Sequence, residues 1–160
     1  MGEKHLSLRD RKWKEFRIGD LFTVTYGKFI KDNKSGDIPY ITTTAKNNGI
    51  GGYVKGTPMY TGNKITIASD GSVGASFYQD KPFSTSNIVS TLTPNSGTIL
   101  NRYIALFICT LIPEEAKKYN YGKKFSVDRV RETLLGLPIT PEGQPDYAFM
   151  EQYIRERARL

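Results

Sequence analysis

The stretch from Lys64 to Pro94 constrains the fold of this chain more than any other segment. Its β-branched, serine and aromatic residues predict strands over 64–69, 75–79 and 88–93. Between the first two runs, the sequence DGSVG at 70–74 supplies the glycines that a tight turn needs. The stretch contains no nucleophile–base pair, no metal-ligand cluster and no nucleotide-binding motif. It therefore indicates a β-scaffold that holds polar loops, and not a reaction centre.

Shorter strands and polar loops are expected ahead of this stretch. Apolar and β-branched runs predict strands over 21–26, 38–44 and 53–55. The segments 27–37 and 46–52 are polar and rich in Gly, Asn and Lys, so they are expected to form loops.

The chain changes character near Thr98, where helical patterns begin. Apolar residues at helical spacing predict a helix over 100–112. Pro113 and the two glutamates after it are typical of a helix start, because proline suits the first turn and acids suit the positive end of the dipole. A second, separate helix is therefore expected from Pro113 to about Asn120.

The last third of the chain predicts two more helices. Ser126 is expected to cap a short helix that stops at Gly136, and 137–140 is expected to be extended. Asp146 is expected to cap a closing helix that runs to the last residue. The sequence thus predicts strands in the first part of the chain and short helices in the last part.

Length and charge limit the classes of protein to consider. A chain of 160 residues can bury one real core, and two domains would be cramped. The 23 Lys and Arg residues exceed the 16 Asp and Glu residues, which gives a net charge of +7. Such a balance suits a polyanionic partner, but it can equally serve only to keep a protein in solution. Charge alone leaves both readings open.

Cysteine content and hydropathy indicate a soluble cytoplasmic protein without membrane association. Cys109 is the single cysteine, so no internal disulfide can form, as expected of an intracellular protein. The first 16 residues lack the apolar core of a signal peptide. The most apolar segment, 99–112, is shorter than the roughly 20 residues that span a bilayer.

The sequence offers little chemistry for catalysis. His5 is the single histidine and lies in a polar N-terminus, which does not favour a Ser–His or Cys–His system. One cysteine and one histidine cannot build a structural zinc site. The chain has neither a P-loop motif nor a dinucleotide-binding glycine motif after a strand. We therefore expect no catalytic residue, no metal and no cofactor.

A binding surface is better supported than an active site. Three polar segments, 28–34, 46–48 and 119–124, combine lysines with amides, hydroxyls or aromatic rings. Lysine neutralises phosphates, and amide and hydroxyl groups can read base edges in a DNA groove. The three segments can act together only if the fold gathers them on one face.

Eight short motifs follow one another along the chain: Trp13–Phe22 (WKEFRIGDLF), Gly27–Lys28, Ile38–Ile41, Asn48–Ile50, Ile67–Gly74, Tyr121–Lys124, Leu137–Ile139 and Pro145–Ile154 (PDYAFMEQYI). Their order resembles the target recognition domain of specificity (S) subunits in Type I restriction-modification enzymes. The resemblance covers the chain from about Trp13 onward. The last motif is similar to S-like domains of related Type II enzymes.

The resemblance implies a fold, a domain organisation and a set of partners. The fold is a mixed α+β one, in which an antiparallel-rich twisted sheet with a few short helices precedes the start of a long C-terminal conserved helix. The recognition domain is expected over 13–145 and the start of the dimerisation helix over 146–160, while the polar residues 1–12 are expected to form a flexible N-terminus. In such subunits two recognition domains are joined by a helical pair, and each reads half of a split site in double-stranded DNA. Methylation and cleavage belong to the partner methyltransferase (M) and restriction (R) subunits.

This chain departs from that pattern because it has one recognition domain and a short helix. We expect either a half-subunit, which could dimerise through its C-terminal helix, or one domain of a longer chain that holds a second. The leading hypothesis is sequence-specific recognition of double-stranded DNA that directs partner methyltransferase and endonuclease subunits. Two alternatives are the recognition domain of a fused methyltransferase-nuclease and a basic protein-interaction module.

The hypothesis assigns two groups of candidate DNA contacts. The expected phosphate contacts are lysines of the polar loops: Lys28, Lys31, Lys34, Lys46, Lys123 and Lys124. The expected base contacts are amides, hydroxyls and one aromatic: Thr43, Asn47, Asn48, Ser72, Ser86, Asn87 and Tyr121. Glycines 71 and 74 are expected to serve the turn and not the DNA.

Overall fold

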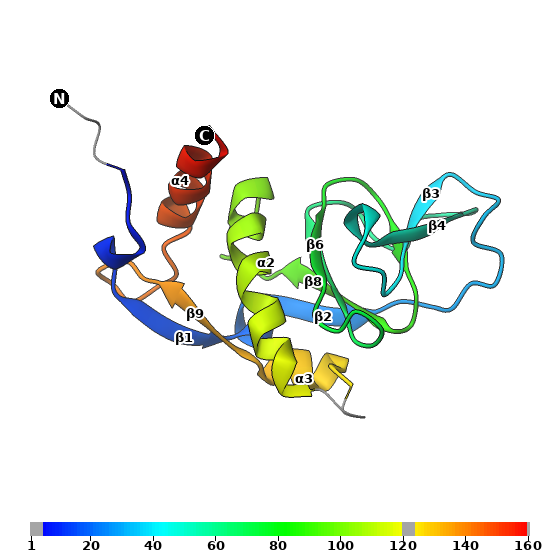
Figure 1. Cartoon of the computed structure of the whole chain (residues 1–160), viewed down its shortest axis with the longest axis horizontal. Helices are drawn as coiled ribbons and strands as arrows, with labels where there is room; N and C mark the ends of the chain where they lie inside the picture. Colours follow the sequence, from blue (N-terminus) through cyan, green and yellow to red (C-terminus); the bar gives the residue numbers. More distant parts are fainter. Residues whose placement is uncertain (1–4, 120–123, 160) are drawn as a thin grey trace.

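An antiparallel sheet of four strands forms the centre of the molecule (Figure 1). The structure is a computed structural model that describes residues 5–119 and 124–159. Neighbouring strands run in the order β2 (Phe22–Tyr26), β8 (Val89–Pro94), β5 (Lys64–Ala68) and β6 (Ser76–Gln79). Three of these strands come from the 64–94 stretch, and the glycine turn connects β5 to β6 as the sequence predicts. The predicted mixed α+β class with antiparallel sheets is confirmed.

A smaller sheet lies beside the first, at the right of Figure 1. Its strands are β4 (Ile50–Val54), β3 (Ile38–Ile41) and β7 (Ser84–Thr85). Strand β3 pairs antiparallel with β4 and parallel with β7. Ile41, Phe83 and Val89 form a small buried cluster, which joins this sheet to β8.

The first and last strands of the chain pair with each other. Strand β1 (Trp13–Arg17) runs antiparallel to β9 (Leu134–Pro138), with Trp13 opposite Pro138. Two short helices lie near this pair, α1 (Ile18–Leu21) and α3 (Val127–Glu132). Three 3-10 turns complete the described structure: η1 (Leu8–Asp10), η2 (Asn47–Gly49) and η3 (Lys117–Tyr119).

Helix α2 (Arg102–Ala116) covers one face of the central sheet and closes the main core. Ile65 and Ile67 of β5 are fully buried in that core, while Thr66 between them points to the opposite face. This alternation lets one strand face an apolar helix on one side and a polar layer on the other. Helix α4 (Tyr147–Ala158) packs against α2 and begins at Asp146, which caps it as predicted.

Two sequence predictions about the helices are wrong. No new helix starts at Pro113, because α2 continues through it to Ala116. Proline removes one backbone hydrogen bond, but here it lies in the last turn of a helix that is buried against the sheet. Gly136 does not stop a helix either. It lies inside β9 opposite Glu15, and α3 ends before it at Glu132.

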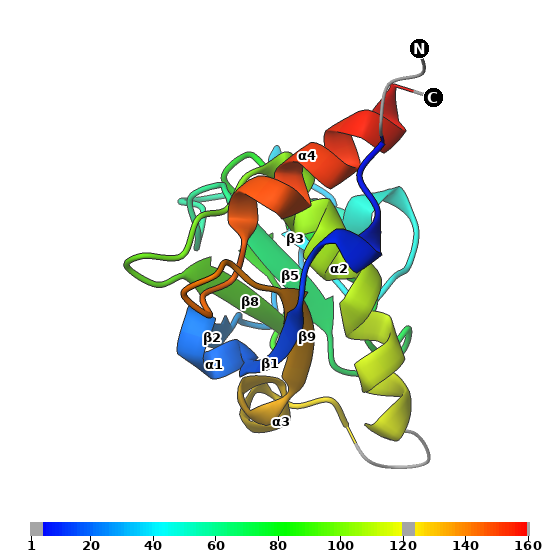
Figure 2. The ribbon, with the colours of Figure 1, turned by 90° about the vertical axis from the view of Figure 1, so that its left-hand side faces the viewer.

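The N-terminal segment lies along α4 (Figure 2). The backbone N–H of Leu6 donates to Glu156 Oε1 at 2.9 Å, and Arg157 donates to the Leu6 carbonyl at 2.9 Å. Arg11 Nε donates to the capping carboxylate of Asp146 at 2.9 Å. Residues 5–12 therefore have defined contacts, while the predicted domain boundaries at 12/13 and 145/146 stay predictions.

Candidate nucleic-acid interface

Backbone hydrogen bonds bring several loops together beyond the ends of β2 and β5. These loops follow β2 and β3, connect β5 to β6, precede β8 and precede α3. The bonds join groups far apart in the chain: Lys28 N to Thr85 O at 3.0 Å, Ser72 N to Thr43 O at 3.2 Å, Ser86 N to Ile41 O at 3.0 Å, and Phe125 N to Ser69 O at 3.1 Å. The fold therefore gathers much of the candidate surface at one end of the sheet.

The turn between β5 and β6 is the structural centre of this end. Gly71 and Gly74 both adopt positive φ, at 61° and 84°, which explains the two glycines. Each also allows close packing. A Cβ on Gly71 would lie 2.6 Å from Thr43 Oγ1, and one on Gly74 would lie 2.4 Å from the Cβ of Ala116. The turn is thus wedged between the loop after β3 and the end of α2.

Six of the predicted contact residues come together here. Lys28, Ser72, Asn87 and Lys124 are exposed, and Thr43 is half-buried. Ser86 is buried at 6% exposure and its hydroxyl accepts from the Ile88 N–H at 3.4 Å, so it supports its loop from within.

Lys46 is exposed and lies a few residues beyond this cluster, in the loop that begins at Thr42. Its backbone N–H donates to Thr44 Oγ1 at 3.2 Å. The lysine thus belongs to a loop that the turn at 70–74 supports, because Ser72 N–H bonds to the Thr43 carbonyl.

Four other predicted residues lie elsewhere or outside the described part of the chain. Lys31 and Lys34 are exposed, but their segment runs beside β4 at the right of Figure 1, where Tyr53 N–H donates to the Asn33 carbonyl at 2.6 Å. Tyr121 and Lys123 lie outside the described residues.

The two asparagines of η2 support the fold around them. Asn47 and Asn48 have positive φ, at 51° and 55°, a conformation that asparagine tolerates. Asn48 Nδ2 donates to the Tyr78 carbonyl at 3.1 Å, and its own carbonyl accepts from Gln79 Nε2 at 3.0 Å. Asn48 therefore holds η2 against β6, and Asn47 leaves its side chain exposed.

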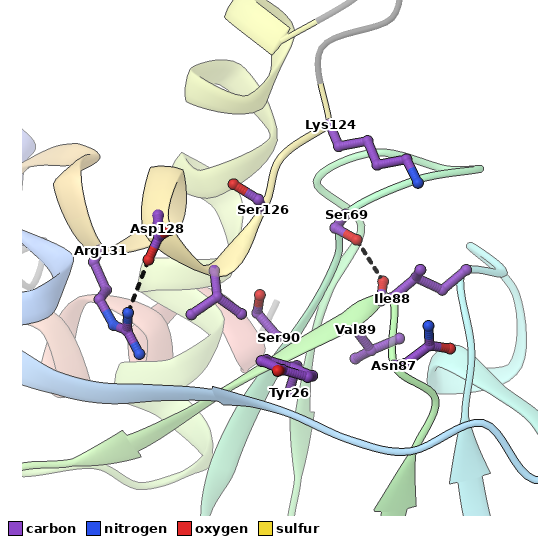
Figure 3. A pocket seen from close by; sticks show the side chains of 11 residues that line it. Tyr26, Ser69, Asn87, Ile88, Val89, Ser90, Lys124, Ser126, Asp128 and Arg131 are labelled. Carbon is purple, nitrogen blue, oxygen red and sulfur yellow. Dashed lines mark hydrogen bonds and ion pairs between the residues drawn. The ribbon is translucent and has the colours of Figure 1, made fainter.

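A hollow lies next to the gathered loops, and we call it the β2–α3 cavity (Figure 3). Its volume is about 420 Å³. It is lined by Tyr26 at the end of β2, by Ser69, by residues 87–90, and by Lys124 with the first residues of α3. Two candidate contacts, Asn87 and Lys124, thus share one concave surface.

Most residues of the lining, among them Tyr26 and Arg131, were not predicted from the sequence as contacts. Tyr26 ends β2 and is 63% exposed. Arg131 Nη2 donates to the Val24 carbonyl at 2.9 Å, and its Nη1 donates to Asp128 Oδ1 at 3.0 Å. These bonds hold α3 against β2. Tyr26 directly precedes the Gly27-Lys28 motif. The sequence pattern of the strand does not show that the ring of its last residue is exposed.

Charges at this end of the molecule are partly balanced. Lys124 Nζ lies 3.9 Å from Asp70 Oδ2, and both side chains are more than half exposed. Exposed pairs of this kind contribute little to stability and can exchange partners readily. Lys28 and Lys46 are exposed as well, so the surface around the turn carries a positive excess.

The groups that sequence analysis examined for catalysis lie away from this end. His5 lies beside Glu156 at the end of α4, and Cys109 lies within α2. Burial raises the pKa of the Cys109 thiol to about 12, so the thiol stays protonated at neutral pH. Among residues 5–119 and 124–159, no group of three or more His, Cys, Asp or Glu side chains is placed to hold a metal ion. None of the helices in those ranges is long and apolar enough to cross a membrane.

Known proteins share both the sequence pattern and the fold of this chain. The chain is 35% identical over 155 residues to the Type II restriction enzyme BgcI specificity subunit S.BcgI of Heyndrickxia coagulans, an alignment that covers 92% of this chain and 44% of that protein. It therefore spans less than half the length of this relative.

Solved structures of S subunits have a similar fold. The Type I restriction-modification S subunit from M. genitalium matches with a TM-score of 0.67 at 19% identity, over 92% of this chain and 38% of that one. The HsdS subunit from Thermoanaerobacter tengcongensis matches with a TM-score of 0.60 at 15% identity, over 92% and 38%. The family described as Type I restriction modification DNA specificity domain matches residues 10–160. With this match and the 35% identical relative, the chain belongs to the Type I restriction-modification DNA specificity domain family.

Proposed function

We propose that this chain recognises a specific sequence in double-stranded DNA and acts as the specificity part of a restriction-modification system. The observation that carries the proposal is the gathering of loops around the β5–β6 turn. There, exposed Lys28 and Lys124 lie on loops that are gathered with those of the polar residues Ser72 and Asn87, and exposed Lys46 lies a few residues beyond them. Cations beside amides and hydroxyls provide phosphate contacts for affinity and hydrogen-bonding groups for base recognition.

The rigid support of these loops favours reading a defined sequence over general attraction to anions. Lys28 and Ser72 are tied through their backbones to Thr85 and Thr43, so their loops start from fixed positions. Base readout requires hydrogen-bond donors and acceptors at fixed positions. A group that is free to move cannot distinguish the correct base from a wrong one. An acidic protein partner would need the lysines but not this arrangement of polar groups.

We further propose that methylation and cleavage belong to partner M and R subunits and that this chain contributes no catalytic residue. The family match and the identity to a specificity subunit support this division. The protonated Cys109 thiol and the position of His5, far from the gathered loops, are consistent with it.

The chain corresponds in this proposal to one of two recognition units. It covers 44% of the related specificity subunit and 38% of the solved S subunits, as one of two similar halves would. The second unit would be another domain or a second copy joined through α4. That helix has 12 residues and already buries Phe149 and Met150 in its own domain, so a contact between copies would use its remaining faces.

Selection from a random duplex library tests the proposal. We expect enrichment of one short half-site of a few base pairs. Replacing Lys28 or Lys124 by alanine should each flatten the slope of log affinity against log salt by about one unit. Lys12→Ala is the matched control, because Lys12 is exposed beside β9 and far from the gathered loops.

Two results would overturn the proposal. One is recovery of random sequence from the selection, together with equal binding to an acidic polypeptide. The other is an identical salt slope for the Lys12, Lys28 and Lys124 variants, which would show that phosphates are not bound at this end.

A further inference from the structure

The β2–α3 cavity has a floor of buried residues and an exposed aromatic ring at its rim (Figure 3). Val89 and Ser90, at the start of β8, are each 1% exposed, and Ser69 is 7% exposed. The Ser90 hydroxyl has no hydrogen-bond partner among the described residues. Tyr26 is the cross-strand partner of Ser90 and is 63% exposed, so its ring lies beside this floor and is open to solvent. An exposed flat ring next to buried residues suits a planar ligand that enters from outside.

Polar groups around the cavity match the edge of a nucleobase. Asn87 offers an amide with both donor and acceptor groups, and Asp128 offers carboxylate oxygens. The Arg131 guanidinium has five N–H donors, of which its bonds to Asp128 and to the Val24 carbonyl use two. Guanidinium, carboxylate and amide side chains form the usual hydrogen-bonded pairs with base edges.

The lining favours a base over a phosphate group. Ile88 and Val127 form apolar walls, which cannot solvate an anion. Each cation of the lining has a carboxylate partner, because Arg131 Nη1 lies 3.0 Å from Asp128 Oδ1 and Lys124 Nζ lies 3.9 Å from Asp70 Oδ2. The volume of about 420 Å³ falls at the small end of the range of about 300–1,000 Å³ typical of ligand pockets, and so suits a single planar group.

A base that remains stacked in a duplex cannot reach this floor. Ser69 and Ser90 are buried whereas Tyr26 and Asn87 are exposed, and a paired base exposes only its groove edge. Lys124 and Lys28 lie near the opening and could hold the backbone of the displaced strand. Leaving the stack costs a few kcal/mol for a base in general, which the contacts inside a pocket can offset.

We propose that the β2–α3 cavity receives one nucleobase that leaves the base stack of the bound DNA, with Tyr26 stacked on it and Arg131, Asp128 and Asn87 at its edge. The inference rests on the proposed function, because it assigns a place to one base of the recognised sequence. It concerns recognition, and no bond is made or broken.

The test places 2-aminopurine, whose fluorescence rises when it no longer stacks between neighbouring bases, at each position of the selected duplex in turn. On binding the full chain, fluorescence should rise strongly at one position only. A mismatch opposite that position should tighten binding about tenfold, because the base then leaves its pair more easily. Tyr26→Leu should remove the rise, whereas the control Tyr53→Leu, at an exposed tyrosine on β4, should keep it.

The outcomes separate the cavity from the DNA-binding surface. Sequence-specific binding without a position-dependent rise overturns the inference and leaves the proposed function intact. A rise of unchanged size at an unchanged half-saturating protein concentration in Tyr26→Leu also overturns it, since Tyr26 would then not contact the displaced base. Saturable binding of free mononucleotides, lost in Tyr26→Leu and without any rise in DNA, would assign the cavity to a free ligand instead. Failure to bind any duplex sequence overturns the proposed function and the inference together.

Discussion

The sharpest test of the fold is to add one methyl group to the β5–β6 turn, by Gly74→Ala. Two costs are expected. Gly74 has a φ of 84°, and an alanine in such a left-handed conformation costs about 1–2 kcal/mol. The new Cβ would lie 2.4 Å from the Cβ of Ala116 and 3.3 Å from the Cα of Pro113. Overpacking of this kind costs about 1–3 kcal/mol.

The two terms predict a loss of about 2–5 kcal/mol from the free energy of unfolding, a large part of the roughly 5–15 kcal/mol of a typical domain. Urea titration followed by circular dichroism and by the fluorescence of Trp13, the single tryptophan, measures it. Gly143→Ala is the matched control. Gly143 has a similar φ of 82° and nothing within 4 Å of its added Cβ, so it should lose only the backbone term.

A second variant isolates the contact with α2. Ala116→Gly removes the Cβ that the new methyl group meets, at a helix-propensity cost of about 1 kcal/mol. In the double variant Gly74→Ala/Ala116→Gly, most of the overpacking loss should disappear, so the two changes should be far from additive. Equal losses for Gly74→Ala and Gly143→Ala, or strict additivity in the double variant, would refute the close packing of the turn on α2.

Two further predictions concern α4 and its N-cap. Asp146→Ala should cost about 1 kcal/mol in urea unfolding, because it removes the cap on the Phe149 N–H, and Asp146→Asn should lose less; equal losses would contradict the capping role. Hydrogen bonds from Arg155, and then from Asn101, lower the pKa of Glu151 below its ordinary 4.5. Its stabilising contribution is thus present above pH 4.5 and lost as pH falls through the lowered pKa. The stability difference between wild type and Glu151→Gln should shrink between pH 7 and pH 3, and a constant difference would argue against it.

Local pattern was enough to predict the elements whose residues interact with near neighbours. The β5–β6 hairpin follows from β-branched runs around a glycine turn, and α4 follows from an apolar face after a capping Asp146. In these segments propensity, turn chemistry and burial agree, so sequence and structure coincide.

The errors arise where distant packing overrides a local signal. Pro113 is a strong helix-start signal, yet α2 runs through it because the helix is held along its length by the sheet below. Gly136 reads as a helix stop, yet it joins a strand whose partner, Glu15, lies far away in the sequence. A local sequence pattern carries no information about the sheet that packs against α2 or about the strand that pairs with Gly136.

The sequence predicted which types of residue could contact DNA, but not how these residues are arranged on the surface. The lysines and amides of the loops are visible in the sequence, whereas their gathering depends on bonds such as Ser72 N–H to the Thr43 carbonyl. Asn48 is a residue type that suits base contacts, but its backbone carbonyl accepts a hydrogen bond from Gln79 of β6 and supports the fold instead. The role of Arg131 depends equally on where α3 packs against β2.

The contact between the N-terminal segment and α4 has a consequence for how this fold can be transferred between proteins. The chain enters and leaves at neighbouring points, since Leu6 is hydrogen-bonded to Glu156 and Arg157. The gathered loops lie near Ala116, at the C-terminal end of α2. This helix is about 22 Å long at a rise of 1.5 Å per residue. A unit with adjacent ends can be inserted into a host chain, exchanged or circularly permuted with little strain. Loops of a different sequence could therefore be introduced by exchanging this whole unit, while its two points of attachment stay the same.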